Sequence, residues 1–240
     1  MKSQERSVAL LDIDGTLMPK NRGIFGVGEA LVHQGRMSQR GLDQMIIARS
    51  RLNTPQGDIR KLAYEDYAEL VLNELARGLE GNPQADVYDI ASRTLLEQKD
   101  TFYPYGQRLI DRIRPTHDTL LVTANADFYA EVFTRHFKVD GFKATVLETE
   151  GGLYTGRVAN HMTRSEHKHQ ATLDVFKKYS HNQSIALGDS EGDAGMLSLV
   201  EIPVAVDPDE KLLEQTQSHW IVATPETVES QLYSRLGLNL

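Results

Sequence analysis

The sequence predicts an α/β fold in which a parallel sheet carries a large helical insertion. Short apolar runs of strand length occur at residues 7–11 and again after residue 116, where segments of helix length separate them. Residues between these regions show helical periodicity and no convincing strand. Strands that alternate with helices favour a parallel sheet with helices on both faces. We therefore expect residues 1–25 and 104–240 to form a core domain and residues 26–103 to form a helical domain.

The composition is that of a soluble globular protein. Of the 240 residues, 40% are hydrophobic and 25% are charged, and the formal net charge is −8. Such acidity argues against duplex nucleic acid or an anionic membrane as a partner. The absence of cysteine excludes disulfides and thiolate catalysis. The first six residues carry no apolar signal-type core, so we expect a cytoplasmic protein.

The first predicted strand ends in two carboxylates. Ser7–Leu11 is apolar without alternation, as in a strand buried on both faces. Asp12 and Asp14 follow it, two residues apart, and therefore point to the same side. A divalent cation would relieve their repulsion, and one carboxylate could then act as nucleophile while the other donates a proton. An ordinary strand-to-loop turn is the alternative, since Asp and Gly are common there.

The remaining elements follow in order. Turn-forming residues at 18–26 predict a loop or hairpin, and the helices of the insertion should break at 54–55 and at 78–83. A turn at 151–156 should separate two short strands. In the second half we expect helices over residues 107–114, 127–137, 165–179, 194–200 and 209–217, and strands over residues 117–123, 142–148, 183–187, 203–206 and 220–222.

Further polar residues stand at ends of these elements. Parallel strands end at one edge of a sheet, so side chains that are distant in sequence can converge there. Asp189 and Asp193 would add hard oxygen ligands to Asp12 and Asp14, a set that suits Mg²⁺.

A phosphate could be held at the same edge. Thr123 and the amides of Ala124 and Asn125 offer hydrogen-bond donors to anionic oxygens, and Lys168 offers a positive charge. A carboxylate nucleophile, a metal and a cation around one tetrahedral anion indicate phosphoryl transfer.

These residues resemble the motifs of the haloacid dehalogenase (HAD) superfamily. Residues 12–17 resemble its first motif, DxDGT, and residues 122–125 its second, a hydroxyl residue that ends a strand. Lys168 resembles the third motif and residues 188–193 the fourth, GDSxxD. Residues 152–156 and 203–212 resemble segments of subfamily IB, which includes phosphoserine phosphatases. The resemblance implies a Rossmann-like core with an inserted all-helical cap of the C1 type.

The resemblance also implies a role for each motif residue. Asp12 would attack phosphorus and become an aspartyl-phosphate, and Asp14 would protonate the leaving oxygen and then activate water. Thr123 and Lys168 would hold the phosphoryl group. The expected Mg²⁺ ligands are Asp12, the backbone carbonyl of Asp14 and Asp189, with Asp193 in support.

The substrate stays open at this stage. Phosphoserine phosphatases usually carry an acidic residue shortly after the first motif, whereas residues 19–22 here are Pro-Lys-Asn-Arg. We expect a Mg²⁺-dependent phosphatase that acts on a small phosphorylated metabolite. A phosphotransferase or phosphomutase with the same chemistry is the alternative, and a non-catalytic binding protein is a more distant one. The sequence does not indicate an oligomeric state.

Several of these residues also have simpler interpretations. Thr123 could cap the following helix, and Lys168 could be a solvated lysine, with Arg164 as a less favoured substitute. His161, His167 and His169 are expected on the surface or in loops. Trp220 is expected in the core or at a sheet edge. Four cap arginines could reach an anionic substrate, although a solvated face is the simpler expectation: Arg36, Arg40, Arg49 and Arg51.

Overall fold

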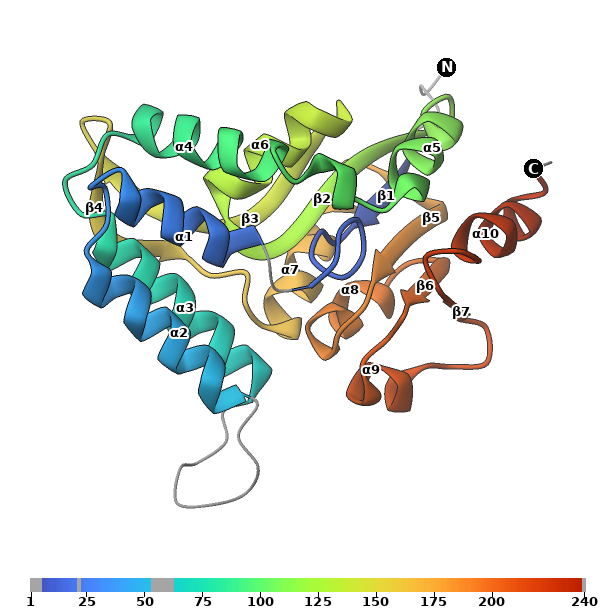
Figure 1. Cartoon of the computed structure of the whole chain (residues 1–240). Coiled ribbons are helices and arrows are strands. Elements are labelled where there is room, and N and C mark those ends of the chain that lie inside the picture. Colours follow the sequence, from blue (N-terminus) through green and yellow to red (C-terminus); the bar gives the residue numbers. More distant parts are fainter. Residues whose placement is uncertain (1–5, 21–22, 53–62, 239–240) are drawn as a thin grey trace.

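The computed structural model describes residues 6–20, 23–52 and 63–238 and contains a seven-stranded sheet. The strand order is β4-β3-β2-β1-β5-β6-β7, and all neighbours are parallel except β3 and β4 (Figure 1). This confirms the predicted α/β class. The strands are β1 (Ser7–Leu11), β2 (His117–Ala126), β3 (Gly141–Glu150), β4 (Leu153–Asn160), β5 (Ser180–Gly188), β6 (Ile202–Val206) and β7 (Ile221–Ala223).

Strand β1 lies at the centre of the sheet and is buried on both faces. Its side chains alternate between two hydrophobic clusters, with Ala9 and Leu11 in one and Val8 and Leu10 in the other. Leu11 is paired in register with Leu121 of β2 and Leu187 of β5. The residues that follow these three strands therefore meet at one edge of the sheet.

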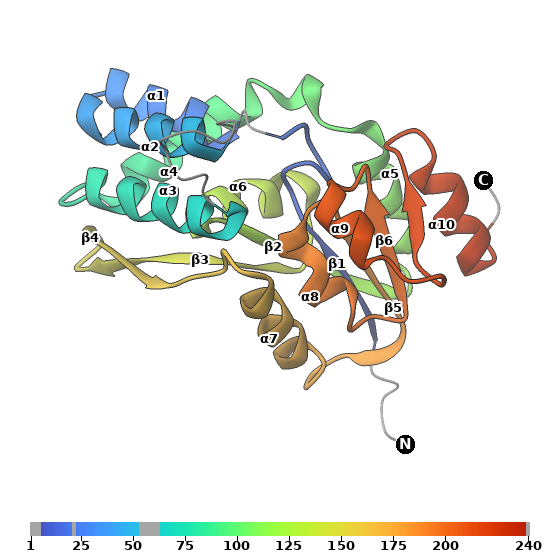
Figure 2. The ribbon, with the colours of Figure 1, turned by 90° about the horizontal axis from the view of Figure 1, so that it is seen from below.

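Helices cover both faces of this sheet. The cluster around Leu11 includes residues of α5, α6 and α10, and the cluster around Leu10 includes residues of α7, α8 and α9. Figure 2 shows α6 and α7 on opposite sides of β3. The helices of this part are α5 (Pro104–Ile113), α6 (Asp127–Phe137), α7 (Ser165–Val175), α8 (Ala194–Leu197), α9 (Glu210–Gln215) and α10 (Val228–Leu236).

In the described residues, four α-helices form the insertion between β1 and α5. They are α1 (Gly23–His33), α2 (Gln39–Leu52), α3 (Tyr64–Gly78) and α4 (Gln84–Leu96). Helix α1 packs against α4 and α2 packs against α3, while α3 and α4 also contact β4 and α6 of the core (Figure 1). This is the inserted all-helical segment that the sequence predicts. No helix in the described ranges is long and apolar enough to cross a membrane.

Some element boundaries differ from the prediction. Helix α1 begins at Gly23, inside the predicted loop of residues 18–26, because Ile24, Phe25 and Val27 bury their side chains on the core. Strand β4 begins at Leu153 and extends well beyond the predicted turn, because its pairing with β3 continues to Asn160. Helix α10 was not predicted. The expected break at residues 54–55 lies outside the described residues.

Candidate active site

The site begins where the chain leaves β1. The amides of Leu17 and Met18 donate to the carbonyl oxygen of Ile13, at 2.8 and 3.1 Å, and close a tight turn. Gly15 has a φ of 94°, which favours glycine, and a Cβ at this position would collide with the Asp189 carboxylate. The turn therefore places Asp12 and Asp14 beside the end of β5.

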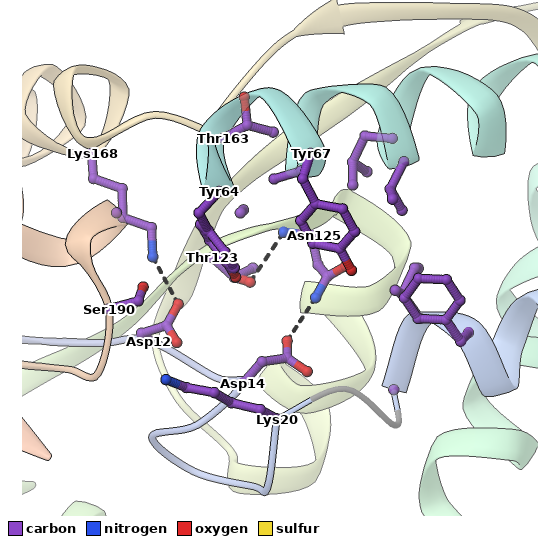
Figure 3. A pocket seen from close by; sticks show the side chains of 18 of the residues that line it. Asp12, Asp14, Lys20, Tyr64, Tyr67, Thr123, Asn125, Thr163, Lys168 and Ser190 are labelled. Atoms are coloured by element: carbon purple, nitrogen blue, oxygen red, sulfur yellow. Dashed lines mark hydrogen bonds and ion pairs between the residues drawn. The ribbon is translucent and has the colours of Figure 1, made fainter. Parts of the chain in front are cut away.

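Two side chains hold Asp14, Asn125 of the second motif and Tyr129 of α6. The Asn125 side-chain amide donates to one carboxylate oxygen at 2.6 Å (Figure 3). The Tyr129 hydroxyl donates to the other carboxylate oxygen at 2.9 Å. Burial raises the pKa of Asp14 to about 6, although both hydrogen bonds favour the ionised form. A carboxyl with this pKa can both donate and accept a proton near neutral pH.

Asp12 is paired with Lys168 instead. Its Oδ1 accepts a hydrogen bond from the Lys168 ammonium at 2.7 Å, and both side chains are almost fully buried. Burial raises the pKa of Asp12 to about 7, and Lys168 opposes that rise. Burial would lower the pKa of Lys168, but Asp12 and Asp193 outweigh it and raise that pKa above the ordinary value. Lys168 is therefore a cation in the floor of the site and not a solvated lysine.

Asp193 braces the lysine and the neighbouring loop. Its Oδ1 accepts from Lys168 at 2.6 Å, and its Oδ2 accepts from the backbone amides of Asp189 and Ser190 at 3.1 and 3.0 Å. The Ser190 hydroxyl donates to the same Oδ2 at 3.0 Å. Both carboxylate oxygens of Asp193 are thus engaged.

Asp189 has an oxygen that fits a metal ligand. It is buried, and its Oδ2 forms an ion pair with the Lys20 ammonium. Burial and the neighbouring carboxylates of Asp193 and Asp12 raise the pKa of Asp189 well above its usual range. Ligand atoms of Asp12, Asp189 and Asp193 lie within 4.8 Å of one another. Three hard oxygen donors at this spacing fit a divalent cation such as Mg²⁺.

The end of β2 supplies the expected phosphate-binding residues. Thr123 is buried, and its hydroxyl oxygen accepts from the Asn125 amide at 3.1 Å. It does not cap α6, because that helix follows Ala126 and has no side-chain cap. Thr123, Ala124 and Asn125 line the same cavity as Asp12 and Lys168 (Figure 3).

This cavity has a volume of about 360 Å³ and lies between the sheet edge and the inserted helices. Its roof comes from α1 and α3 and includes Tyr64 and Tyr67, which Figure 3 shows above Thr123 and Asn125. The predicted site residues did not include these tyrosines, Tyr129 or Lys20. Of these residues, only Lys20 had a signal in the sequence, because it stands shortly after the first motif, where phosphoserine phosphatases usually carry an acidic residue.

Other candidates lie elsewhere. Arg164 points to three acidic residues of α3 and does not line the cavity. Arg36 pairs with Asp86, and the Arg49 guanidinium lies 5.0 Å from the centre of the Phe25 ring. Trp220 is 8% exposed and packs in the core, as expected.

Comparison with known proteins gives the family. The sequence profile of the haloacid dehalogenase-like hydrolases matches residues 9–198, so the chain belongs to this family. The matched range includes the residues that the structure gathers at the sheet edge: Asp12, Asp14, Thr123, Lys168, Asp189 and Asp193.

Individual known proteins also resemble this chain, at modest sequence identity. Phosphoserine phosphatase SerB1 of Mycobacterium tuberculosis is 32% identical over 94 residues, which are 38% of this chain and only 30% of that protein. A solved protein of unknown function from Bordetella pertussis Tohama I matches with a TM-score of 0.69 and 23% identity, over 92% of this chain and all of the other. A phosphoserine phosphohydrolase-like protein from Francisella tularensis matches with a TM-score of 0.66 and 13% identity, over 94% and 99% of the two chains. The two structural likenesses establish the fold.

Proposed function

We propose that the protein is a Mg²⁺-dependent phosphatase that hydrolyses a small phosphomonoester through an aspartyl-phosphate at Asp12. The observation that carries the proposal is the division of partners between two aspartates only two residues apart. Asp12 contacts Lys168 and lies close to the Asp189 carboxylate. Asp14 instead accepts hydrogen bonds from Asn125 and Tyr129. This division supports a nucleophile and a separate proton carrier.

The first step would transfer the phosphoryl group to the protein. Lys168 and the donors at Thr123–Asn125 would hold its oxygens while an Asp12 oxygen attacks phosphorus. The bond from phosphorus to the leaving oxygen breaks, and Asp14 gives its proton to that oxygen.

The second step would release phosphate. Asp14, now ionised, takes a proton from a water molecule, which attacks the phosphorus of the aspartyl-phosphate and frees Asp12. Its pKa of about 6 suits both transfers.

We propose that Asp12, the Asp14 carbonyl and Asp189 hold Mg²⁺, with Asp193 in support. A bound Mg²⁺ would neutralise charge on the transferring group. The engagement of both Asp193 oxygens favours a bracing role for this residue over direct coordination.

We also propose that residues 26–103 act as a cap domain over a core of residues 1–25 and 104–240, and that the protein acts in the cytoplasm. The cavity between the roof helices and the sheet edge supports the cap. A cap of this kind would exclude bulk water during the reaction and select the substrate.

The test is phosphate release from a panel of small phosphomonoesters, with wild type and Asp12→Asn, in Mg²⁺ and in chelator. We expect release that needs both Mg²⁺ and Asp12. A variant with the wild-type rate would contradict the proposal. An acceptor-dependent phosphoester product with little free phosphate would instead support a phosphotransferase.

A further inference from the structure

The roof of the cavity is apolar. Its residues come from α1 and α3 and are almost all buried: Ile24, Phe25, Tyr64, Tyr67, Ala68, Val71 and Leu72. Among these described residues, the only polar side-chain atoms are the two tyrosine hydroxyls. The part of the substrate beyond the phosphoryl group would lie against this surface, because the floor holds the phosphate-binding residues.

Two charged groups at the rim already have partners. Lys20 contacts the Asp189 carboxylate. Asp209 caps α9, where its oxygens accept from the amides of Leu212 and Glu191 at 2.8 and 3.3 Å. Lys20 would have to give up its contact with Asp189 to bind a carboxylate of a substrate, whereas each Asp209 oxygen keeps acceptor capacity.

A zwitterionic leaving group fits this roof poorly. An ammonium or carboxylate that lay against the described residues of the roof would lose water and meet no charged side chain there, and such desolvation is strongly unfavourable. An apolar group would instead gain by leaving water. A cavity of about 360 Å³ has room for such a group beside the phosphoryl group.

We infer that the substrate is a phosphomonoester of an uncharged, apolar alcohol, alkyl or aryl, and not of an amino acid. This inference rests on the proposed phosphatase function and deepens it. The residues that select the substrate are then those of the roof. Val71, at the middle of α3, is one of them.

The experiment measures kcat/KM for n-alkyl phosphates from ethyl to hexyl, and for phosphoserine. These alkyl alcohols have nearly equal basicity, so differences along the series report contact with the cavity and not the chemistry. We expect kcat/KM to rise about two- to fourfold for each added methylene. Hexyl phosphate should exceed phosphoserine by roughly tenfold or more.

A matched pair of variants locates the effect. Val71→Thr keeps the shape of the roof but adds a hydroxyl, and should flatten the chain-length dependence. Val87→Thr makes the same change at an equally buried position of α4 that does not line the cavity, and should leave the dependence unchanged. Circular dichroism checks that both variants are folded.

The outcomes separate this inference from the proposed function. Asp12-dependent turnover with a flat alkyl series, or with phosphoserine preferred, overturns the inference and leaves the phosphatase intact. Failure of every ester to release phosphate in an Asp12-dependent way overturns both. An equal loss of slope in both valine variants would show that the roof does not select the substrate.

Discussion

At the scale of single residues, Tyr129 influences the ionisation of Asp14, the proposed proton carrier. Its hydroxyl donates to Asp14, stabilises the ionised carboxylate and so lowers the pKa of Asp14. Tyr129→Phe should raise this pKa above about 6 and shift the alkaline limb of the pH profile of kcat to higher pH. On the plateau of the profile kcat should fall roughly tenfold, because Asp14 loses the hydrogen bond that orients its carboxyl group. Tyr154→Phe, another buried tyrosine remote from the site, is the control, and an unmoved profile in Tyr129→Phe would exclude this positioning role.

A second prediction concerns stability and pH. Burial raises the pKa of Asp127, the first residue of α6, to about 6. The native state therefore prefers the protonated form, and this contribution is present below about pH 4 and is lost as the pH rises through 6. Asp127→Asn should raise the free energy of unfolding at pH 8 by about 1–2 kcal/mol, with little gain at pH 4.

Urea unfolding at the two pH values measures this difference. Asp111→Asn, at an exposed position of α5, is the control and should change stability equally at both. If Asp127→Asn destabilises the protein at pH 8, the favourable interaction of the carboxylate with the helix N-terminus outweighs the cost of burial.

At the scale of elements, α3 and α7 are joined by Arg164. Its guanidinium contacts Glu65, Asp66 and Glu69 at 3.4, 3.0 and 2.9 Å, and Glu65 also accepts from the Ser165 amide at 2.8 Å. These contacts tie the roof helix to the helix that carries Lys168.

Arg164→Gln should therefore weaken the attachment of α3 to α7. Exposed ion pairs contribute about 0.2–1 kcal/mol each, so the loss of all three should raise KM by between about threefold and about 150-fold. The expected change in kcat is smaller, because Lys168 keeps its partners. Steady-state kinetics at low and high salt measures the effect. Arg157→Gln breaks an ion pair within the β3–β4 hairpin and should change neither constant.

The same elements show what the sequence can and cannot predict. Strands β1, β5 and β6 were predicted because buried parallel strands are continuous apolar runs. The motif residues at the ends of β1, β2 and β5 were predicted because such strands end at one edge, whereas Lys168 was predicted from its resemblance to the third motif of the family. The prediction missed Tyr64, Tyr67 and Tyr129, because a tyrosine on the apolar face of a helix is expected to pack in the core. Helix α10 was missed because it is short and only Val228, Leu232 and Tyr233 are buried.

At the scale of the whole molecule, the acidic group links metal binding to stability. Asp12, Asp189 and Asp193 are buried close together, and their mutual repulsion destabilises the metal-free protein. Under the proposed function, Mg²⁺ at about 100 times its Kd should raise the free energy of unfolding by about 2.7 kcal/mol. Thermal unfolding in Mg²⁺ and in chelator, at matched ionic strength, measures the gain.

Asp189→Asn should stabilise the metal-free protein and abolish the stabilisation by Mg²⁺. It removes one charge from the acidic group, so the metal-free variant should unfold at a higher Tm than metal-free wild type. It also removes a ligand, so Mg²⁺ should no longer raise its Tm. A full Mg²⁺-dependent gain in this variant would place the metal elsewhere.

The four inserted helices separate two strands that lie side by side in the sheet. Strands β1 and β2 pair in register, yet all of α1–α4 and α5 lie between them in the chain. The entropy of closing a flexible loop grows only with the logarithm of its length, by roughly 0.6 kcal/mol for each doubling. A connection at this point can therefore lengthen or shorten during evolution at little cost to folding. The residues proposed to perform the chemistry stay on the sheet edge, while the inserted helices can change without moving them.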